Sequence, residues 1–227
     1  MQSYVEVFSH SPLLKGIAPE AYEKLLACLE AHTKHFPRGG YILRAGEPPI
    51  QVGLILSGSA HIMKEDFWGN RAILADVQPG ELFGEAFACA AAPLLEVSAV
   101  ATESSDVLFF NLQNLLSPCP SACGFHTRLI RNLVEILAQK NVGLTQKLEH
   151  LSRRSTREKL LSFLSACALR QGGARFTIPF NRQELADYLF VDRSAMSAEL
   201  SKLRSEGLIA YHKNQFQLLQ ANTAGKR

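Results

Sequence analysis

The apolar positions between residues 178 and 219 follow the spacing of two short helices and then that of a hairpin. Asn181 and Glu184 stand three residues apart, which is the capping-box pattern that begins a helix. Asp192 is an N-cap for a second helix, which Gly207 would end. The second helix carries an apolar stripe at spacings of four and three: Met196, Leu200 and Leu203. Two short helices joined so closely are typical of a helix-turn-helix.

Alternating apolar residues follow the second helix and predict a small β-hairpin. Ile209 and Tyr211 alternate on its first strand. Phe216 and Leu218 alternate on the return strand, after a two-residue turn at Lys213–Asn214. Two helices followed by such a hairpin form a winged helix-turn-helix, whose second helix usually enters the major groove of DNA. A helical subdomain with an ordinary polar face is the alternative.

Between residues 38 and 110, short apolar runs alternate with glycines. The runs are 41–43, 52–56, 60–63, 72–74 and 107–110. Many short strands with glycine turns at near-regular spacing predict an all-β roll or barrel. The predicted fold is therefore α+β: an N-terminal double-stranded β-roll of the jelly-roll, cupin-like kind, a long dimerisation helix, and a C-terminal winged helix-turn-helix.

The long helix is predicted for residues 125–151, which contain no proline and keep a helical period throughout. One seam has the heptad spacing of a coiled coil: Ile130, Val134, Leu137, Asn141, Leu144, Leu148 and Leu151. Asn141 falls at an a position, where a buried asparagine fixes register and oligomer state. A second stripe, which we expect to pack on the β-roll of the same chain, consists of Leu129, Leu133 and Ile136. Two apolar stripes need two partners, so we predict a parallel homodimer; a buried helix within a monomer is the alternative.

Charge is divided unevenly along the chain. Residues 152–227 hold thirteen Lys and Arg against six Asp and Glu, a net charge of +7. Residues 1–151 hold eleven against fifteen, a net charge of −4. Such asymmetry is typical of nucleic-acid binding by the basic part. The sequence shows no apolar run of membrane-spanning length, no signal-peptide pattern and no disulfide framework among its five cysteines, so we expect a cytoplasmic protein without a membrane partner.

Two sets of residues carry a resemblance to a known family. In the predicted β-roll they are Gly40, Gly46, Glu47, Gly58 and the run Gly-Glu-Leu-Phe-Gly-Glu at 80–85; beyond it they are residues 151–161, 182–186 and 192–194. This ordered set resembles the Crp/Fnr-type bacterial transcription regulators over nearly the whole chain. The resemblance implies a cyclic-nucleotide-binding-like sensor in residues 1–120, a dimerisation helix in 121–151, a DNA-binding domain in 152–220 and a tail at 221–227. It also implies a ligand-responsive homodimer on a palindromic operator in double-stranded DNA, with RNA polymerase as a candidate partner.

Family members that bind cyclic AMP carry Gly-Glu-x-x-Gly-Glu and, after a short loop, Arg-Ser or Arg-Thr and Ala. Their glutamate takes the ribose hydroxyl and their arginine holds the phosphate. This chain has the first part at 80–85, but Val97 stands where the arginine would be and Glu96 precedes it. An anion there would lack its guanidinium partner, so cyclic AMP is disfavoured. We expect a less anionic or more apolar small-molecule effector, or a β-roll that binds none. The implied effector pocket consists of Gly84, Glu85, Val97, Ser98 and Asn141.

The resemblance places the DNA contacts at the start of the second helix of the helix-turn-helix. The implied base-reading residues are Arg193, Ser194, Ser197 and Ala198, and the candidate phosphate contacts are Gln183, Lys202, Arg204, Lys213 and Asn214. The family usually has arginine at the position of Ala198, and its loss removes a guanine contact worth ~1–3 kcal/mol of discrimination. We therefore expect a half-site that differs from the usual one. Phe190 stands in the turn where the family often has glycine.

The cysteines raise metal or redox chemistry as an alternative. Iron–sulfur members of the family use a cysteine group near the N-terminus, where this chain has only Cys28, so we expect no iron–sulfur cluster. At a helix start, Cys119, Cys123 and His126 would share one face, which makes them a weak candidate for a metal or thiol–disulfide site. Small packed thiols are the simpler interpretation.

Two further functions stay open beside the ligand-responsive DNA-binding regulator. One is an effector-binding module that acts on a protein partner through its C-terminal domain. The other is a cysteine-based redox-sensing or metal-sensing regulator. The sequence shows no Ser/His/Asp grouping, P-loop or dinucleotide fingerprint, and we predict that the protein is not an enzyme.

Overall fold

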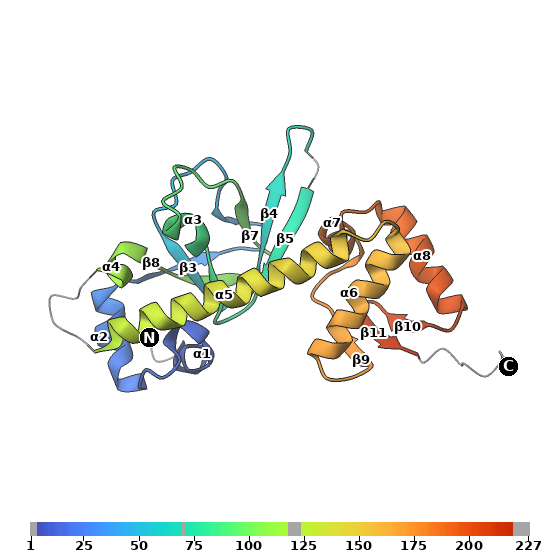
Figure 1. Cartoon of the computed structure of the whole chain (residues 1–227). Helices are drawn as coiled ribbons and strands as arrows, with labels where there is room; N and C mark the ends of the chain where they lie inside the picture. The colour runs from blue at the N-terminus through green and yellow to red at the C-terminus, as the bar shows by residue number, and fades with distance from the viewer. Residues whose placement is uncertain (1–3, 70, 118–123, 220–227) are drawn as a thin grey trace. The chain divides into compact units, whose positions relative to one another are not determined.

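The computed structural model describes residues 4–69, 71–117 and 124–219 (Figure 1). The chain divides into two units, Met1–Asn141 and Val142–Arg227. The long helix α5 (Phe125–Leu151) contributes to both of them. None of the helices in the described residues has the length and hydropathy of a membrane span.

Two four-stranded antiparallel sheets form the β-roll of the N-terminal unit. The strands of the first sheet, in spatial order, are β1 (His32–Phe36), β8 (Ser105–Phe110), β3 (Val52–Ser57) and β6 (Leu82–Phe83). Those of the second are β2 (Tyr41–Leu43), β7 (Ser98–Ala101), β4 (Ala60–Glu65) and β5 (Arg71–Val77). The predicted β-roll is confirmed.

The central strand β3 is buried on both faces, so its apolar run is continuous instead of alternating. Ile55 faces the other sheet, in a cluster with Ile42 and Ala99. Leu54 and Leu56 face the helices, in a second cluster. The helices before and after the strands of the roll are α1 (Val5–His10), the 3₁₀ turns Pro12–Leu14 and Pro19–Ala21, α2 (Tyr22–Cys28), α3 (Glu85–Cys89) and α4 (Leu112–Leu116).

Helix α5 buries one of its two apolar stripes in the N-terminal unit. Leu129, Leu133 and Ile136 join the cluster that contains Leu54, as the second stripe predicted. The other seam stays largely uncovered: Val134, Leu144 and Leu148 are exposed, and Ile130 and Leu137 are partly buried. Asn132 fixes the helix further, because its Nδ2 donates to the backbone oxygens of Leu13 at 2.7 Å and Lys15 at 2.9 Å.

The hairpin of β4 and β5 ends in two exposed aromatic residues. Phe67 and Trp68 form an edge-to-face pair with ring centroids 5.9 Å apart, which is within the usual spacing for such contacts. Asp66 organises the turn, because its Oδ1 accepts a hydrogen bond of 2.9 Å from the backbone nitrogen of Trp68. Gly69 has a φ of +81°, a left-handed conformation that glycine adopts without strain.

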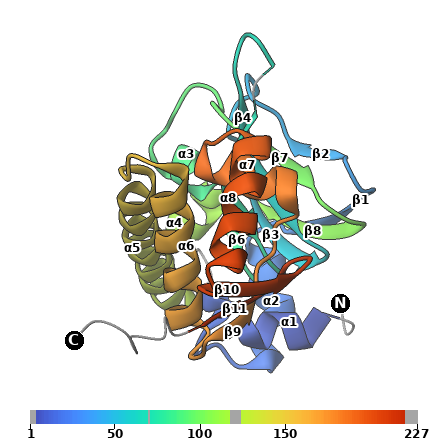
Figure 2. The same ribbon diagram turned by 90° about the vertical axis from the view of Figure 1, so that its right-hand side faces the viewer.

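The C-terminal unit is a winged helix-turn-helix, as predicted (Figure 2). Its elements are α6 (Thr156–Arg170), β9 (Arg175–Thr177), α7 (Arg182–Leu189), α8 (Arg193–Ser205), β10 (Ile209–His212) and β11 (Gln215–Leu218). The capping box of α7 is present: Asn181 Oδ1 accepts from the backbone of Gln183 and Glu184, and Glu184 Oε2 accepts from the backbone of Asn181. The short strand β9, which the sequence pattern did not predict, pairs with β11 and makes the wing three-stranded.

Candidate functional site

The first half of the predicted effector pocket lies where β6 meets α3. Gly84 caps α3 with a φ of +82°, and a Cβ there would lie 3.1 Å from Cδ1 of Leu43. Glycine therefore serves both the backbone conformation and the close approach to β2. Glu85 follows as the first residue of α3, and only 3% of its side chain is exposed.

The second half of the predicted pocket lies at the start of β7, the strand that pairs with β2. Ser98 Oγ accepts a hydrogen bond of 3.0 Å from the backbone nitrogen of Ala45, and Leu43 pairs with Ala99. Gly84 and Ser98 therefore both lie against residues 43–45, at and just after the end of β2. Val97 is partly exposed beside Ser98.

Lys140 extends into this region from α5, and it was not among the residues predicted from the sequence. Its Nζ donates to Oε1 of Glu85 at 2.7 Å and to the backbone oxygen of Leu82 at 2.6 Å. Asn141, the residue expected to line the pocket, is the exposed neighbour of Lys140. A signal was present in the sequence, because Lys140 continues the inward stripe Leu129, Leu133 and Ile136 at the helical spacing of four.

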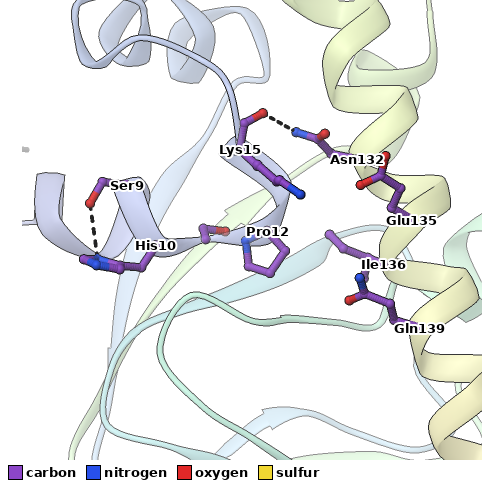
Figure 3. Close-up of a pocket in the computed structure, with 9 residues that line it drawn as sticks. Ser9, His10, Pro12, Lys15, Asn132, Glu135, Ile136 and Gln139 are labelled. Atoms are coloured by element: carbon purple, nitrogen blue, oxygen red, sulfur yellow. Dashed lines mark hydrogen bonds between the residues drawn. The ribbon is translucent and has the colours of Figure 1, made fainter.

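A pocket of about 240 Å³ lies elsewhere in the N-terminal unit, between α1, the turn that follows it, and α5 (Figure 3). Its lining residues are Ser9, His10, Ser11, Pro12, Lys15, Asn132, Glu135, Ile136 and Gln139. Asn132 points at the backbone of Lys15, and the His10 ring is bonded to Ser9 Oγ at 3.2 Å. None of the predicted effector residues lines this pocket.

Helix α8 presents the predicted base-reading residues on the side opposite its buried stripe. Arg193, Ser194 and Ala198 are exposed and Ser197 is partly exposed, whereas Met196 is buried. The serine hydroxyls are oriented by local bonds. Ser194 Oγ donates to Asp192 Oδ1 at 2.5 Å, and Ser197 Oγ donates to the backbone oxygen of Arg193 at 2.9 Å. Each hydroxyl oxygen keeps acceptor capacity for a base-edge donor.

The candidate phosphate contacts differ in how firmly they are held. Lys202 Nζ donates to Glu199 Oε1 at 2.9 Å, and Gln183 Nε2 donates to Asp187 Oδ1 at 2.8 Å. Lys213 stands at the tip of the wing with a φ of +53°. Asn214 Nδ2 donates a hydrogen bond of 3.2 Å to the backbone oxygen of Ile178. This bond within the domain holds the Asn214 side chain in place.

Stacked cations attach the wing to the helices. The Arg182 guanidinium lies 4.7 Å from the ring centroid of Tyr211 and 5.2 Å from that of Phe216. Arg204 lies 5.1 Å from the Tyr211 ring. Burial lowers the pKa of Arg182, but it stays charged at any physiological pH. These cation–π contacts hold the wing beside α7 and α8.

A buried lysine contacts the turn between α7 and α8. Lys147 of α5 lies within the C-terminal unit, with its Nζ 3.8 Å from the centroid of Tyr188 and 5.8 Å from that of Phe190. Burial lowers the pKa of Lys147 to about 8. Phe190 adopts a φ of +53°, a left-handed conformation that glycine adopts without strain. Lys147 was not among the residues predicted from the sequence.

Of the three residues in the weak candidate metal site, the structure describes only His126; Cys119 and Cys123 lie outside the described residues. His126 is buried, and its Nε2 donates to the backbone oxygen of Asn114 on α4 at 3.0 Å. Cys89 ends α3, where burial and the charge of Glu85 raise the pKa of its thiol. Among the residues that the structure describes, no group of three metal-binding side chains occurs.

A Ser–His–Asp arrangement occurs at the surface of the β-roll, although the sequence showed no such grouping. His35 Nδ1 lies 2.8 Å from Asp106 Oδ1, and Ser104 Oγ lies 3.3 Å from His35 Nε2. His35 and Ser104 are exposed at the pairing of β1 with β8. Ser57 and Tyr4 also donate to Asp106, so the carboxylate belongs to a surface network. A serine nucleophile would not be shielded from water there.

Two family models match the chain. Residues 33–119 match the cyclic nucleotide-binding domain, and residues 158–222 match the Crp-like helix-turn-helix domain. The first coincides with the β-roll, and the second with α6 to the wing. The fold and the matches together define a DNA-binding regulator with a sensor domain.

Similar proteins of known function are transcription regulators. The cyclic AMP receptor protein of Thermus thermophilus is 28% identical over 205 residues, which cover 88% of both chains. A CRP-like cAMP-activated global transcriptional regulator of Mycobacterium tuberculosis is 23% identical over 90% of both chains. The solved c-di-GMP-responsive regulator CLP of Xanthomonas campestris has a TM-score of 0.73 at 19% identity, covering 89% of this chain and 99% of that one. The chain belongs to the Crp/Fnr-type family of transcription regulators.

Proposed function

We propose that the protein is a homodimeric transcription regulator that binds a palindromic DNA site and responds to a small molecule other than cyclic AMP. The observation that carries the proposal is the division of α5 into two apolar stripes. One stripe, at Leu129, Leu133 and Ile136, is buried within the chain, and the other, at Val134, Leu144 and Leu148, is exposed.

The exposed seam supports a second copy of α5 as its partner. Burying each exposed leucine contributes about 1.5–3 kcal/mol, so a few such residues from two chains supply a stable interface. In a parallel pair, Asn141 would meet the Asn141 of the partner at an a position and fix the register. A two-fold axis along α5 would present two α8 helices to half-sites about one helical turn apart.

The DNA contacts that we propose follow from the exposed face of α8. Arg193, Ser194, Ser197 and Ala198 would face base edges, with Ala198 against a thymine methyl. Gln183, Lys202 and Lys213 would contact phosphates. Because alanine stands at position 198, we propose a half-site without the guanine that an arginine would read. A regulator that binds DNA and contacts RNA polymerase would work in the cytoplasm.

The effector site that we propose consists of Gly84, Glu85, Val97, Ser98 and Asn141, within a sensor at residues 1–120. Relatives are named for cyclic AMP, but this chain has Val97 in place of the arginine that holds the phosphate. Glu96 does not compensate, because it is acidic and pairs with Lys64 at 3.4 Å on the surface. We also propose that residues 121–151 serve as the dimerisation helix and that residues 152–220 form the DNA-binding domain.

The test is an electrophoretic mobility shift with the DNA upstream of the protein's own gene, across a series of salt concentrations. We expect the logarithm of the association constant for DNA to fall linearly with the logarithm of the salt concentration. Arg193→Ala should weaken it at least tenfold, whereas Arg175→Ala, on β9, should leave it unchanged. Absent or salt-insensitive binding would contradict the proposal. Regulation that survives Arg193→Ala would favour the alternative, in which the C-terminal domain acts on a protein partner.

A cysteine-based metal or redox sensor is the second candidate function. One observation favours it: His126 is bonded to α4, and α3, which ends at Cys89, packs on α4. Cys119 and Cys123 follow α4 in the sequence. Thiolate and imidazole groups are the ligands that zinc prefers. Metal analysis of the purified protein tests this function: about one zinc per chain, lost in Cys123→Ser and kept in Cys167→Ser, would support it, and metal-free protein would reject it.

A further inference from the structure

The pocket between α1 and α5 has two walls that the chain holds in fixed positions (Figure 3). Asn132 of α5 lines it and is only 2% exposed, and its bonds to the backbone of Leu13 and Lys15 attach the turn after α1 to the helix. Ser11, which precedes that turn, is 1% exposed, and its Oγ donates to the backbone oxygen of Gly80 at 2.8 Å. The pocket is therefore largely preformed, as sites for small molecules usually are.

Opposite charges extend into this pocket from its two walls. Lys15 follows the turn and Glu135 lies on α5, and Figure 3 shows their side chains directed toward each other. The two groups form no ion pair with each other, and the Lys15 ammonium has no hydrogen-bond partner among the described residues. Glu135 keeps an oxygen available, because Arg131 Nε donates only to Oε1, at 3.3 Å. An ammonium and a carboxylate thus face the same space without neutralising each other.

The size and the remaining lining of the pocket restrict what it can hold. Its volume of about 240 Å³ is below the roughly 300–1,000 Å³ of sites for drug-sized molecules, so the space suits a molecule smaller than a nucleotide. Ile136 and Pro12 supply apolar surface between the two charges. The Gln139 amide and the His10 ring add neutral polar groups, and Nδ1 of that ring is bonded to the backbone of α1 at 2.8 Å.

We propose that this pocket binds a small zwitterion of the α-amino acid class, whose carboxylate pairs with Lys15 and whose ammonium group pairs with Glu135. Each charge of such a ligand meets its opposite, and both contacts are charge-assisted hydrogen bonds. A simple anion would also meet the like charge of Glu135, and a simple cation that of Lys15, which is unfavourable. An uncharged side chain of the ligand fits against Ile136. The site is separate from the effector pocket and adds a second small-molecule site to the proposed function.

The pocket lies on the side of α5 that faces away from the exposed seam. In the heptad that places Asn141 at position a, Asn132 and Gln139 fall at f and Glu135 falls at b. These positions point outward when two helices pair through their a and d residues, so the pocket stays open in the proposed homodimer. A ligand there bridges α5 and the turn that Ser11 attaches to Gly80, and it should stabilise the N-terminal unit.

Thermal shift and isothermal titration of the full-length protein test the inference, with L-serine, L-valine, L-leucine and L-glutamine as probes. We expect saturable binding of at least one of them, with a melting temperature that rises with its concentration. The N-acetyl derivative of that amino acid lacks the ammonium charge and its α-amide lacks the carboxylate, so each should bind at least tenfold more weakly. No binding of any of the four, or derivatives that bind as tightly as the amino acid, would overturn the proposal.

Variants locate the ligand in this pocket. Lys15→Met and Glu135→Gln should each weaken amino acid binding at least tenfold. Lys24→Met and Glu23→Gln, at exposed residues of α2, are the matched controls and should bind as the unchanged protein does. Circular dichroism checks that each variant is folded, and the two derivatives test the need for both charges in the unchanged protein. Equal binding by Lys15→Met and Lys24→Met would overturn the assignment of the site.

Discussion

The Nζ of Lys147 lies 3.8 Å from the ring centroid of Tyr188, so a cation near the end of α5 rests on an aromatic face of α7. A cation over a tyrosine ring is stabilised by about 0.5–2 kcal/mol, and more when water is excluded. Burial acts in the opposite sense, because it removes water from the ammonium and lowers its pKa from 10.5 to about 8. The folded state therefore carries this charge at a cost.

Stability should consequently rise with pH above about 8. Between the lowered pKa and 10.5, the unfolded chain holds the Lys147 proton and the folded chain does not, so the free energy of unfolding increases with pH. The full window corresponds to about 3 kcal/mol. Urea unfolding at several pH values between 7.5 and 9.5 measures the rise, and Lys147→Met should abolish it. Parallel curves for the two proteins would show that Lys147 is not responsible. The window ends below pH 10 because burial raises the pKa of Tyr188, and above that range the tyrosine acts in the opposite direction.

Substitutions of Phe190 measure the backbone strain in the turn of the helix-turn-helix. Its φ of +53° is unfavourable for any residue with a Cβ. Phe190→Ala and Phe190→Gly both lose the ring near Lys147, but only glycine adopts this backbone conformation freely. We expect Phe190→Gly to be more stable than Phe190→Ala by about 1 kcal/mol in chemical denaturation. Equal stability would mean that the turn relaxes when the ring is removed.

A substitution of Leu148 tests whether the exposed seam of α5 is the dimer interface. Its side chain is 67% exposed in the single chain, and Leu169 on α6 is 81% exposed. If two α5 helices pair, Leu148→Glu places two carboxylates in the interface and removes two leucines, each worth about 1.5–3 kcal/mol. We expect it to raise the dimer dissociation constant at least a hundredfold in analytical ultracentrifugation. Leu169→Glu should leave the dimer intact, and a dimer that tolerates both changes would exclude this seam.

Alanine substitutions at two glycines should change the stability of the protein in opposite directions. A Cβ at Gly53 on β3 would overlap the buried ring of Phe83, so Gly53→Ala should destabilise the protein by about 1–3 kcal/mol. A Cβ at Gly143 on α5 would meet no atom within 4 Å, so Gly143→Ala should stabilise it by about 0.5–1 kcal/mol. Thermal unfolding of the two variants checks both signs. Destabilisation by Gly143→Ala would show that this part of α5 is more crowded than in the single chain.

The features that the sequence predicted are those with local causes. Asn181 and Glu184 cap α7 through bonds that span three residues, and the stripe of Leu129 and Leu133 repeats within one helix. Strand β9 escaped prediction because three residues are too few to show an alternating pattern, and its partner β11 lies about forty residues further on.

Lys140 and Lys147 show the corresponding limit for the candidate sites. Each lies on α5, and a lysine on a long helix is ordinarily a solvated residue. The partners of the two lysines, Glu85 and Tyr188, are set by how separate elements pack on the helix. Spacing along α5 can indicate that a lysine faces inward, but it cannot identify the carboxylate or the ring that the lysine meets.

The tip of the β4–β5 hairpin has an optical consequence. Trp68 is the single tryptophan of the chain, and it is 82% exposed. Its fluorescence in the native protein should therefore already resemble that of a water-exposed indole, and unfolding of the core would change the emission wavelength little. The same exposure makes Trp68 a built-in reporter of its own surroundings, since any molecule that covers the hairpin tip would shift the emission to the blue without a label.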